Sequence, residues 1–139
     1  MNNKTDKKRA GLKKIIFYVM LVAFITGLIG TAAVFHSIYS DVKQVAQAAR
    51  TKFPGDSVQA LVACLQSDDV SFEDKNKAVW ALGQIADSRA LQPLKNLYTG
   101  VECEKPCSKR NKICQYELEK AVEFCSGKFS ATKWMYSRL

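Results

Sequence analysis

The stretch KNKAVWALGQIADSRALQPLKNL, residues 75–97, decides the fold class of this chain. Its apolar residues recur three or four positions apart on both sides of Asp87-Ser88, which is the spacing of one buried helix face. Aspartate and serine end one helix and cap the next, and Pro93 then falls early in the second helix, where a missing N–H costs least. The stretch therefore predicts two helices joined by a tight turn, the first of them reaching Ile85 and the second spanning residues 89–98.

The same organisation extends upstream of this pair. Asp56 or Ser57 is placed to cap another helix after a stop at residues 53–55, and Ser71 with Asp74 predicts a capping box at the start of the next. Residues 59–61, QAL, align with residues 92–94, QPL, at an offset of 33, which lies in the range of solenoid repeats. The sequence therefore predicts an all-α fold built from short repeated helices.

Residues 78–94, AVWALGQIADSRALQPL, resemble the HEAT-like repeat of the phycobilisome-lyase type. The hallmark of that repeat is an A-x-x-A-L-G-x-I-G-D-x-R-A-x-x-x-L run over two antiparallel helices, and Ala86 stands where the family commonly has glycine. The upstream pair, residues 41–66, matches only in its second helix, so the resemblance covers about half of the chain beyond residue 35. It implies protein binding much more often than catalysis, and no residue pattern suggests a bilin site.

A charge-free apolar run, IIFYVMLVAFITGLIGTAAVF, occupies residues 15–35. A helix of this length spans about 31 Å, which is the thickness of a bilayer's hydrocarbon core. We expect a retained transmembrane helix that continues over residues 38–53, where apolar residues keep the three-four spacing. A cleaved signal peptide is the alternative, because Thr31-Ala32-Ala33 imitates a cleavage site, although signal apolar regions usually run only about 7 to 15 residues.

The charges around this run predict the topology of the chain. Residues 1–14 carry six Lys or Arg and one Asp, whereas the stretch just past the apolar run offers only His36, Asp41 and Lys43, and basic flanks stay cytoplasmic. We therefore expect a single-pass inner-membrane protein with a cytoplasmic tail (1–14), a transmembrane helix (15–35), and periplasmic or extracellular HEAT-like repeats (36–100) followed by a Cys-rich cap with an aromatic, basic tail (101–139). The membrane topology accounts for half of the formal net charge of +8, through the basic residues 1–14. No nucleic-acid partner is therefore expected.

Four cysteines lie close together near the C-terminal end, and an exported compartment favours their oxidation. On one helix over residues 113–125, Cys114 and Cys125 would share a face but stand about 16 Å apart, too far to bridge each other or share a zinc ion. Each is expected to pair with Cys103 or Cys107, in either order, and so to staple the C-terminal helix. Cys64 is expected to be a buried free thiol.

Catalysis has little support in the sequence. His36 is the one histidine, so neither a Ser-His-Asp nor a Cys-His constellation can form, and no C-x-x-C motif occurs. We therefore expect no enzyme, cofactor, metal site or small-molecule substrate. The rival hypothesis is an exported thiol-disulfide redox protein that uses Cys103 and Cys107. A cytoplasmic zinc-binding adaptor with inverted topology is a third, which the basic N-terminus disfavours.

Four residues are predicted to bind a partner: Trp80, Gln84, Trp134 and Tyr136. Trp80 lies about 160° to 200° around its helix from the predicted core face, so it either anchors a protein partner or packs against the first helix or beneath the tail. The aromatic, basic tail docks either on its own domain or on a partner or membrane surface. We expect a protein-interaction module that acts on membrane-associated proteins as a scaffold, assembly factor or accessory subunit of an envelope complex.

Overall fold

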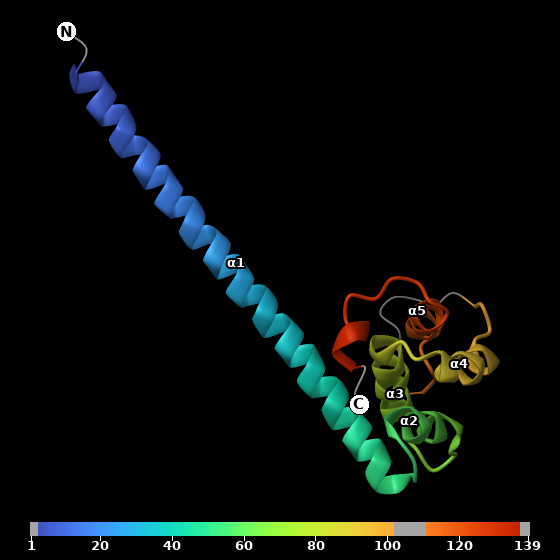
Figure 1. Ribbon diagram of the computed structural model, residues 1–139. Coiled ribbons are helices and arrows are strands. Elements are labelled where there is room, and N and C mark those ends of the chain that lie inside the picture. Colours follow the sequence, from blue (N-terminus) through green and yellow to red (C-terminus); the bar gives the residue numbers. More distant parts are fainter. Residues whose placement is uncertain (1–2, 102–110, 137–139) are drawn as a thin grey trace. The chain divides into compact units, whose positions relative to one another are not determined.

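The computed structural model describes residues 3–101 and 111–136, and every regular element within these ranges is a helix. The predicted all-α fold class is therefore confirmed. The elements, shown in Figure 1, are α1 (Asn3–Lys52), α2 (Ser57–Gln66), α3 (Phe72–Ile85), the 3-10 helix η1 (Ser88–Ala90), α4 (Leu91–Leu97), α5 (Gln115–Cys125) and the 3-10 helix η2 (Lys133–Tyr136).

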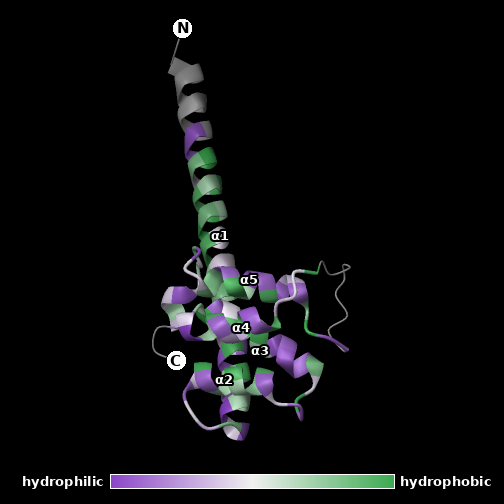
Figure 2. Cartoon of the chain, turned by 90° about the vertical axis from the view of Figure 1, so that its right-hand side faces the viewer, coloured by the Kyte–Doolittle hydropathy of each residue, from purple (hydrophilic) through white to green (hydrophobic). Residues whose placement is uncertain are grey.

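The first helix, α1, carries the apolar run and continues without interruption to Lys52, as expected. Figure 2 shows the run as a continuous hydrophobic stretch, and its large apolar side chains are exposed. In the described part of the chain, this is the one helix long and apolar enough to cross a membrane, with a mean hydropathy of 2.3 in its apolar window and none of that window buried. Its length and composition suit a membrane span or a signal sequence.

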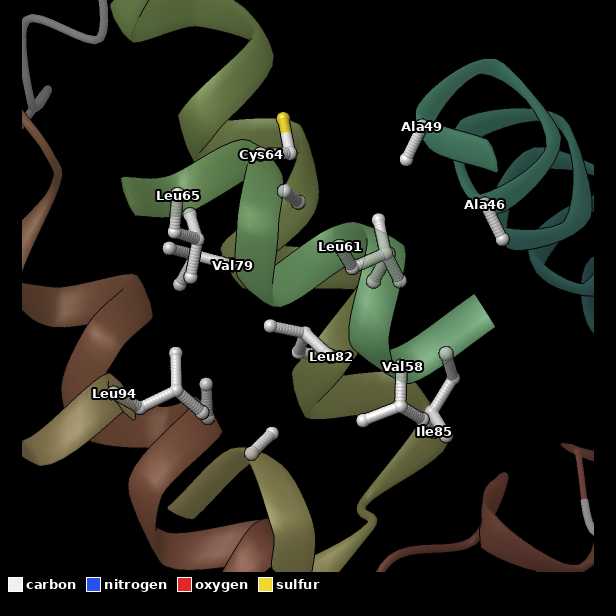
Figure 3. Packing of buried hydrophobic residues seen from close by; sticks show 14 of the residues in the cluster. Ala46, Ala49, Val58, Leu61, Cys64, Leu65, Val79, Leu82, Ile85 and Leu94 are labelled. Carbon is white, nitrogen blue, oxygen red and sulfur yellow. The ribbon is translucent and has the colours of Figure 1, made fainter. Parts of the chain in front are cut away.

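The chain divides into two compact units, residues 1–37 and 38–139. The second unit contains the last turns of α1 together with all the other helices, and it holds the hydrophobic core. In this unit α3 is central, because it packs against both α2 and α5. Large, fully buried side chains come from α2, α3, α4 and α5, and Figure 3 labels four of them: Leu61, Val79, Leu82 and Leu94.

The predicted helix caps are formed. Asp56 accepts a hydrogen bond from the Gln59 N–H at 2.9 Å, and the Gln59 side chain accepts one from the Asp56 N–H at 3.1 Å, which completes a capping box. Ser71 caps α3 by accepting from the Asp74 N–H at 3.2 Å. Here the box is not reciprocal, because the Ser71 hydroxyl donates to the Asp74 carboxylate at 3.0 Å.

The turn from α3 to α4 explains the glycine of the resembling repeat. Ala86 ends α3 in the left-handed conformation, with φ at 54°, where a glycine would avoid the strain of a Cβ. Asp87 then caps η1, and only after it does α4 begin. The predicted single helix over residues 89–98 is thus a 3-10 turn followed by a shorter α-helix, with Pro93 in its first turn.

One arginine joins two of these turns. The Arg89 guanidinium forms ion pairs with Asp87, which caps η1, and with Asp56, which caps α2. The Gln59 N–H and then Arg89 hold the pKa of Asp56 below its usual range, and Arg89 does the same for Asp87. This network ties the start of α2 to the turn that precedes α4.

Candidate functional site: a groove between α1 and α3

The last turns of α1 and the first half of α3 enclose a groove of about 520 Å³, which we call the α1–α3 groove. Its floor includes Leu61 and Cys64 of α2, and its apolar walls include Val45 and Ala48 of α1 and Ala78 of α3. Asp41, Gln44 and Lys52 complete the α1 side, while Asp74 and Lys77 stand on the α3 side. The groove therefore combines an apolar interior with a polar rim.

Small side chains on α1 leave this space open. Val42, Ala46 and Ala49 form the buried stripe of α1, and Figure 3 shows Ala46 and Ala49 on the side of α1 that faces α2. Ala48 also lines the groove and is exposed. Because alanine carries only one methyl group, α1 does not reach α3 with side chains long enough to fill the gap. Ala48 and Ala49 are the small side chains of α1 that line the groove.

Trp80 is half-buried in the wall of this groove. It packs against the hydrophobic core cluster. It also lines a shallow depression of about 30 Å³ toward α5, together with Gln84. A large aromatic ring at the edge of an open apolar groove has the composition and position of an interface anchor.

The rim of the groove carries both signs of charge. Lys77 forms ion pairs with Glu73 at 3.0 Å and with Asp74 at 3.4 Å, and this pairing raises the pKa of Lys77. The Ser71 hydroxyl and then Lys77 hold the pKa of Asp74 below its usual range. Lys77 and Asp74 are therefore charged at neutral pH, and exposed ion pairs of this kind orient a partner more than they add affinity.

A second hollow of about 750 Å³ lies between the tail and the turn after α3, and we call it the tail hollow. Trp134 and Tyr136 line it together with Phe129, Lys133 and Arg89. Tyr136 is buried, and its ring stacks on Tyr39 of α1 with 5.7 Å between the ring centroids. Burial raises the pKa of the Tyr136 hydroxyl to about 12.

The four predicted partner-binding residues thus fall into two places. Trp80 belongs to the α1–α3 groove, whereas Trp134 and Tyr136 belong to the tail hollow. Gln84 is tied to the tail, because its side-chain oxygen accepts a hydrogen bond from the Thr132 hydroxyl at 2.9 Å. The tail therefore docks on its own domain through Thr132 and Tyr136, and Trp134 remains 74% exposed.

The predicted disulfide staple has no support in the structure. Cys114 and Cys125 are buried free thiols, and their predicted partners Cys103 and Cys107 lie outside the described residues. Cys114 is the N-cap of α5, and its N–H donates to Asn76 of α3 at 2.7 Å. The Cys125 thiol donates to the Leu82 carbonyl at 3.6 Å, and desolvation raises its pKa to about 11.

In the described residues α5 packs against α3, and Cys125 belongs to the hydrophobic core cluster. The predicted helix over residues 113–125 begins two residues later than expected, at Gln115. Cys64 is a buried free thiol, as expected, and it faces the groove rather than the closed interior. Among the described residues, no three His, Cys, Asp or Glu side chains gather closely enough to hold a metal ion.

Sequence reasoning missed the groove itself. Trp80 was predicted from its angle around the helix, whereas the groove residues of α1 and α2 were not singled out as a binding site. The available signal was the run of alanines on the last turns of α1, because such small side chains can leave space between packed helices. Only the placement of three helices around the same space turns these residues into a site.

The sequence model of the PBS lyase HEAT-like repeat matches residues 75–99, which include most of α3 and all of α4. Together with the all-helical structure, this match supports a HEAT-like repeat protein. Comparisons with curated proteins and with solved structures gave no match. HEAT-like repeats commonly mediate protein interactions, and the match points to a non-catalytic repeat module.

Proposed function

We propose that this chain is a membrane-anchored, non-enzymatic protein-interaction module that binds an amphipathic helix of a membrane-associated protein in the α1–α3 groove. In this role it serves as a scaffold, an assembly factor or an accessory subunit of an envelope complex. The open groove beside a HEAT-like repeat is the observation that carries the proposal.

The chemistry of the groove favours a helix as the bound element. Its floor and walls offer apolar contacts at Leu61, Ala78 and Trp80, while its charged groups stand at the rim. An amphipathic helix presents apolar side chains at three- and four-residue spacing and keeps its polar face outward, which matches this arrangement. A small-molecule site would instead place a few converging polar groups inside the pocket.

The anchor is proposed to be residues 15–35. The exposed apolar window of α1 supports this assignment, and the basic residues 1–14 favour a cytoplasmic N-terminus with the repeat domain in the periplasm or outside the cell. The partner would then present its helix on that same side of the membrane.

Photo-cross-linking in intact cells tests the groove. A photoreactive amino acid replaces Gln44 at the groove rim, and the matched control replaces Gln92, an exposed glutamine on α4. We expect Gln44 to yield one discrete adduct that Gln92 does not yield and that Trp80→Ala abolishes. Identical adduct patterns from the two positions, or no adduct from Gln44, would contradict the proposal.

A further inference from the structure

The C-terminal tail is fixed at one end of the repeat domain. Tyr136 stacks on Tyr39, which is the second residue of the domain unit, and Thr132 donates a hydrogen bond to the Gln84 carbonyl at 3.2 Å. The stacking holds Tyr136 beside Tyr39, four residues after the apolar run ends. The tail therefore cannot move far from that point while the domain is folded.

Chain length alone places this point close to the apolar run. Tyr39 follows Phe35 by four residues of the continuous helix α1, and four helical residues rise about 6 Å along the helix axis. Trp134 precedes Tyr136 by two residues, which adds at most about 7 Å. The interfacial layer outside the hydrocarbon core is about 5 to 8 Å thick on each side of a bilayer. If residues 15–35 span the membrane, the tail lies within reach of the lipid headgroups.

The tail also has the composition of an interfacial anchor. Phe129 is 87% exposed and Trp134 is 74% exposed. Two large aromatic rings exposed this close together in the sequence suggest an interaction surface. Lys133 is adjacent and exposed, and residues 126–139 contain Lys or Arg but no Asp or Glu. Tryptophan and basic residues concentrate at membrane–water interfaces because one part of each side chain is apolar and another is polar or charged.

We propose that Phe129, Trp134 and Lys133 form a docking surface for an anionic phospholipid bilayer, which holds the repeat domain against the membrane that carries its anchor. This inference rests on the proposed membrane anchor. Docking would restrict the rotation of the domain and so orient the α1–α3 groove relative to the bilayer plane.

Tryptophan fluorescence of the full chain in vesicles tests this surface. The chain has two tryptophans, so Trp80→Phe leaves Trp134 as the one reporter, and Trp134→Phe leaves Trp80 as the matched control. Each variant is reconstituted in phosphatidylcholine vesicles containing phosphatidylglycerol, with or without lipids brominated near the top of the acyl chains. Far-ultraviolet circular dichroism confirms that both variants keep the helical fold.

We expect brominated lipids to quench Trp134 strongly and Trp80 weakly, and aqueous iodide to quench Trp134 less when vesicles are present. Replacing Lys133 with Gln should shift the equilibrium between docked and free tail by about fivefold in anionic vesicles. Quenching that is the same with Lys133→Gln, or without phosphatidylglycerol, would overturn the anionic specificity. Trp134 that stays open to iodide and insensitive to brominated lipid would overturn the docking and leave the surface for a protein partner.

Flotation of the same samples after alkaline carbonate separates this inference from the anchor on which it rests. If the protein floats with the vesicles but brominated lipid does not quench Trp134, the docking surface is contradicted and the anchor is not. If alkaline carbonate extracts the protein from the vesicles, the membrane anchor is contradicted, and the docking surface that depends on it is contradicted as well.

Discussion

The two flanks of α3 differ, although they belong to the same helix. On the flank that faces α5 the backbones are close, since a Cβ on Gly83 would stand 3.2 Å from the Cα and Cβ atoms of Ala121. On the flank that faces α1, a groove of about 520 Å³ remains. We call these the closed flank and the open flank. The difference shows that one helix can pack closely on one side and leave an open groove on the other.

Residue choice explains the difference. On the closed flank, the buried Asn76 bridges the two elements, donating to the Lys112 carbonyl at 2.9 Å and accepting from the Cys114 N–H. The glycine and alanine at the contact then let α5 approach closely. On the open flank α1 also offers alanines, but no comparable glycine or polar bridge is found among the described contacts of α1 with α3, and the space between them is not closed.

The largest predicted effect comes from adding the same side chain to each flank. Ala121→Leu inserts three carbons into the closed flank and should lower the free energy of unfolding by about 3 kcal/mol. Ala48→Leu points into the open flank, where it should change that free energy by no more than about 0.5 kcal/mol. Urea unfolding in detergent, followed by circular dichroism, measures both. Equal losses in the two variants would contradict the comparison.

The polar bridge of the closed flank should matter nearly as much. Asn76→Leu removes the acceptor for the Cys114 N–H and leaves that buried group without its hydrogen bond, which should cost about 2 kcal/mol of unfolding free energy. Asn96→Leu on α4 is the control, since Asn96 is exposed and bonds only locally to Gln92 in the described contacts. A loss at residue 76 no larger than that at residue 96 would show that the bridge does not secure α5.

Two thiols report the flanks directly. Cys125 lies on the closed flank and has a pKa of about 11, whereas Cys64 lines the groove, with a pKa raised mainly by desolvation. At roughly pH 8 we expect maleimide to modify Cys64 about tenfold faster than Cys125 in the folded protein. Peptide mass spectrometry measures the two rates.

The same reagent also retests the staple. After unfolding without a reductant, Cys114 and Cys125 should both react fully, because they are free thiols in the structure. Protection of either one until a reductant is added would restore the disulfide prediction.

The smallest effect is expected at the turn network outside both flanks. Asp56→Ala removes the cap of α2 and should cost about 1 kcal/mol, whereas Asp56→Asn keeps a capping side chain and should cost less. Thermal unfolding of the two variants separates the cap from the ion pair with Arg89. A larger loss in Asp56→Asn than in Asp56→Ala would contradict this division.

Acid should weaken the same network. The folded-state pKa values of Asp56 and Asp87 lie below the usual value for aspartate, so the folded protein binds fewer protons than the unfolded chain in the range where aspartate titrates. Their contribution is therefore present above about pH 4 and is lost as the pH falls through the folded-state pKa values. Asp56→Asn should show a shallower loss of stability on acidification than the wild type, and an equal slope would contradict this origin.

The sequence predicted the helices well because their signals are local. Asp56, Ser71 and Asp87 act through neighbours two or three residues away, so their capping roles could be read directly from the chain. The apolar run and its continuation to Lys52 were equally local. Ala86 was noted as a departure from the repeat, but only its φ of 54° shows what the usual glycine provides.

The groove and the packing of α5 were harder to predict, because both depend on contacts between residues far apart in the sequence. Asn76 accepts a hydrogen bond from the Cys114 N–H, 38 residues further along the chain, and no local sequence pattern predicts that bond. The cysteine spacing favoured disulfides, yet packing in the α3–α5 interface accounts for Cys114 and Cys125 without them. Trp80 and Trp134 were both selected as exposed aromatics, but sequence could not show that they belong to different surfaces.

Binding of a partner helix in the α1–α3 groove in the cell is tested most directly by the ratio of the alkylation rates of Cys64 and Cys125. The ratio is measured in intact cells and again after purification in detergent, with Cys125 as the internal standard for changes in the fold. A bound helix would cover Cys64 in the cell, so the account predicts a low ratio in cells that rises severalfold after purification. An equal ratio in the two states would mean that the groove is empty in the cell and would contradict its role as the partner site.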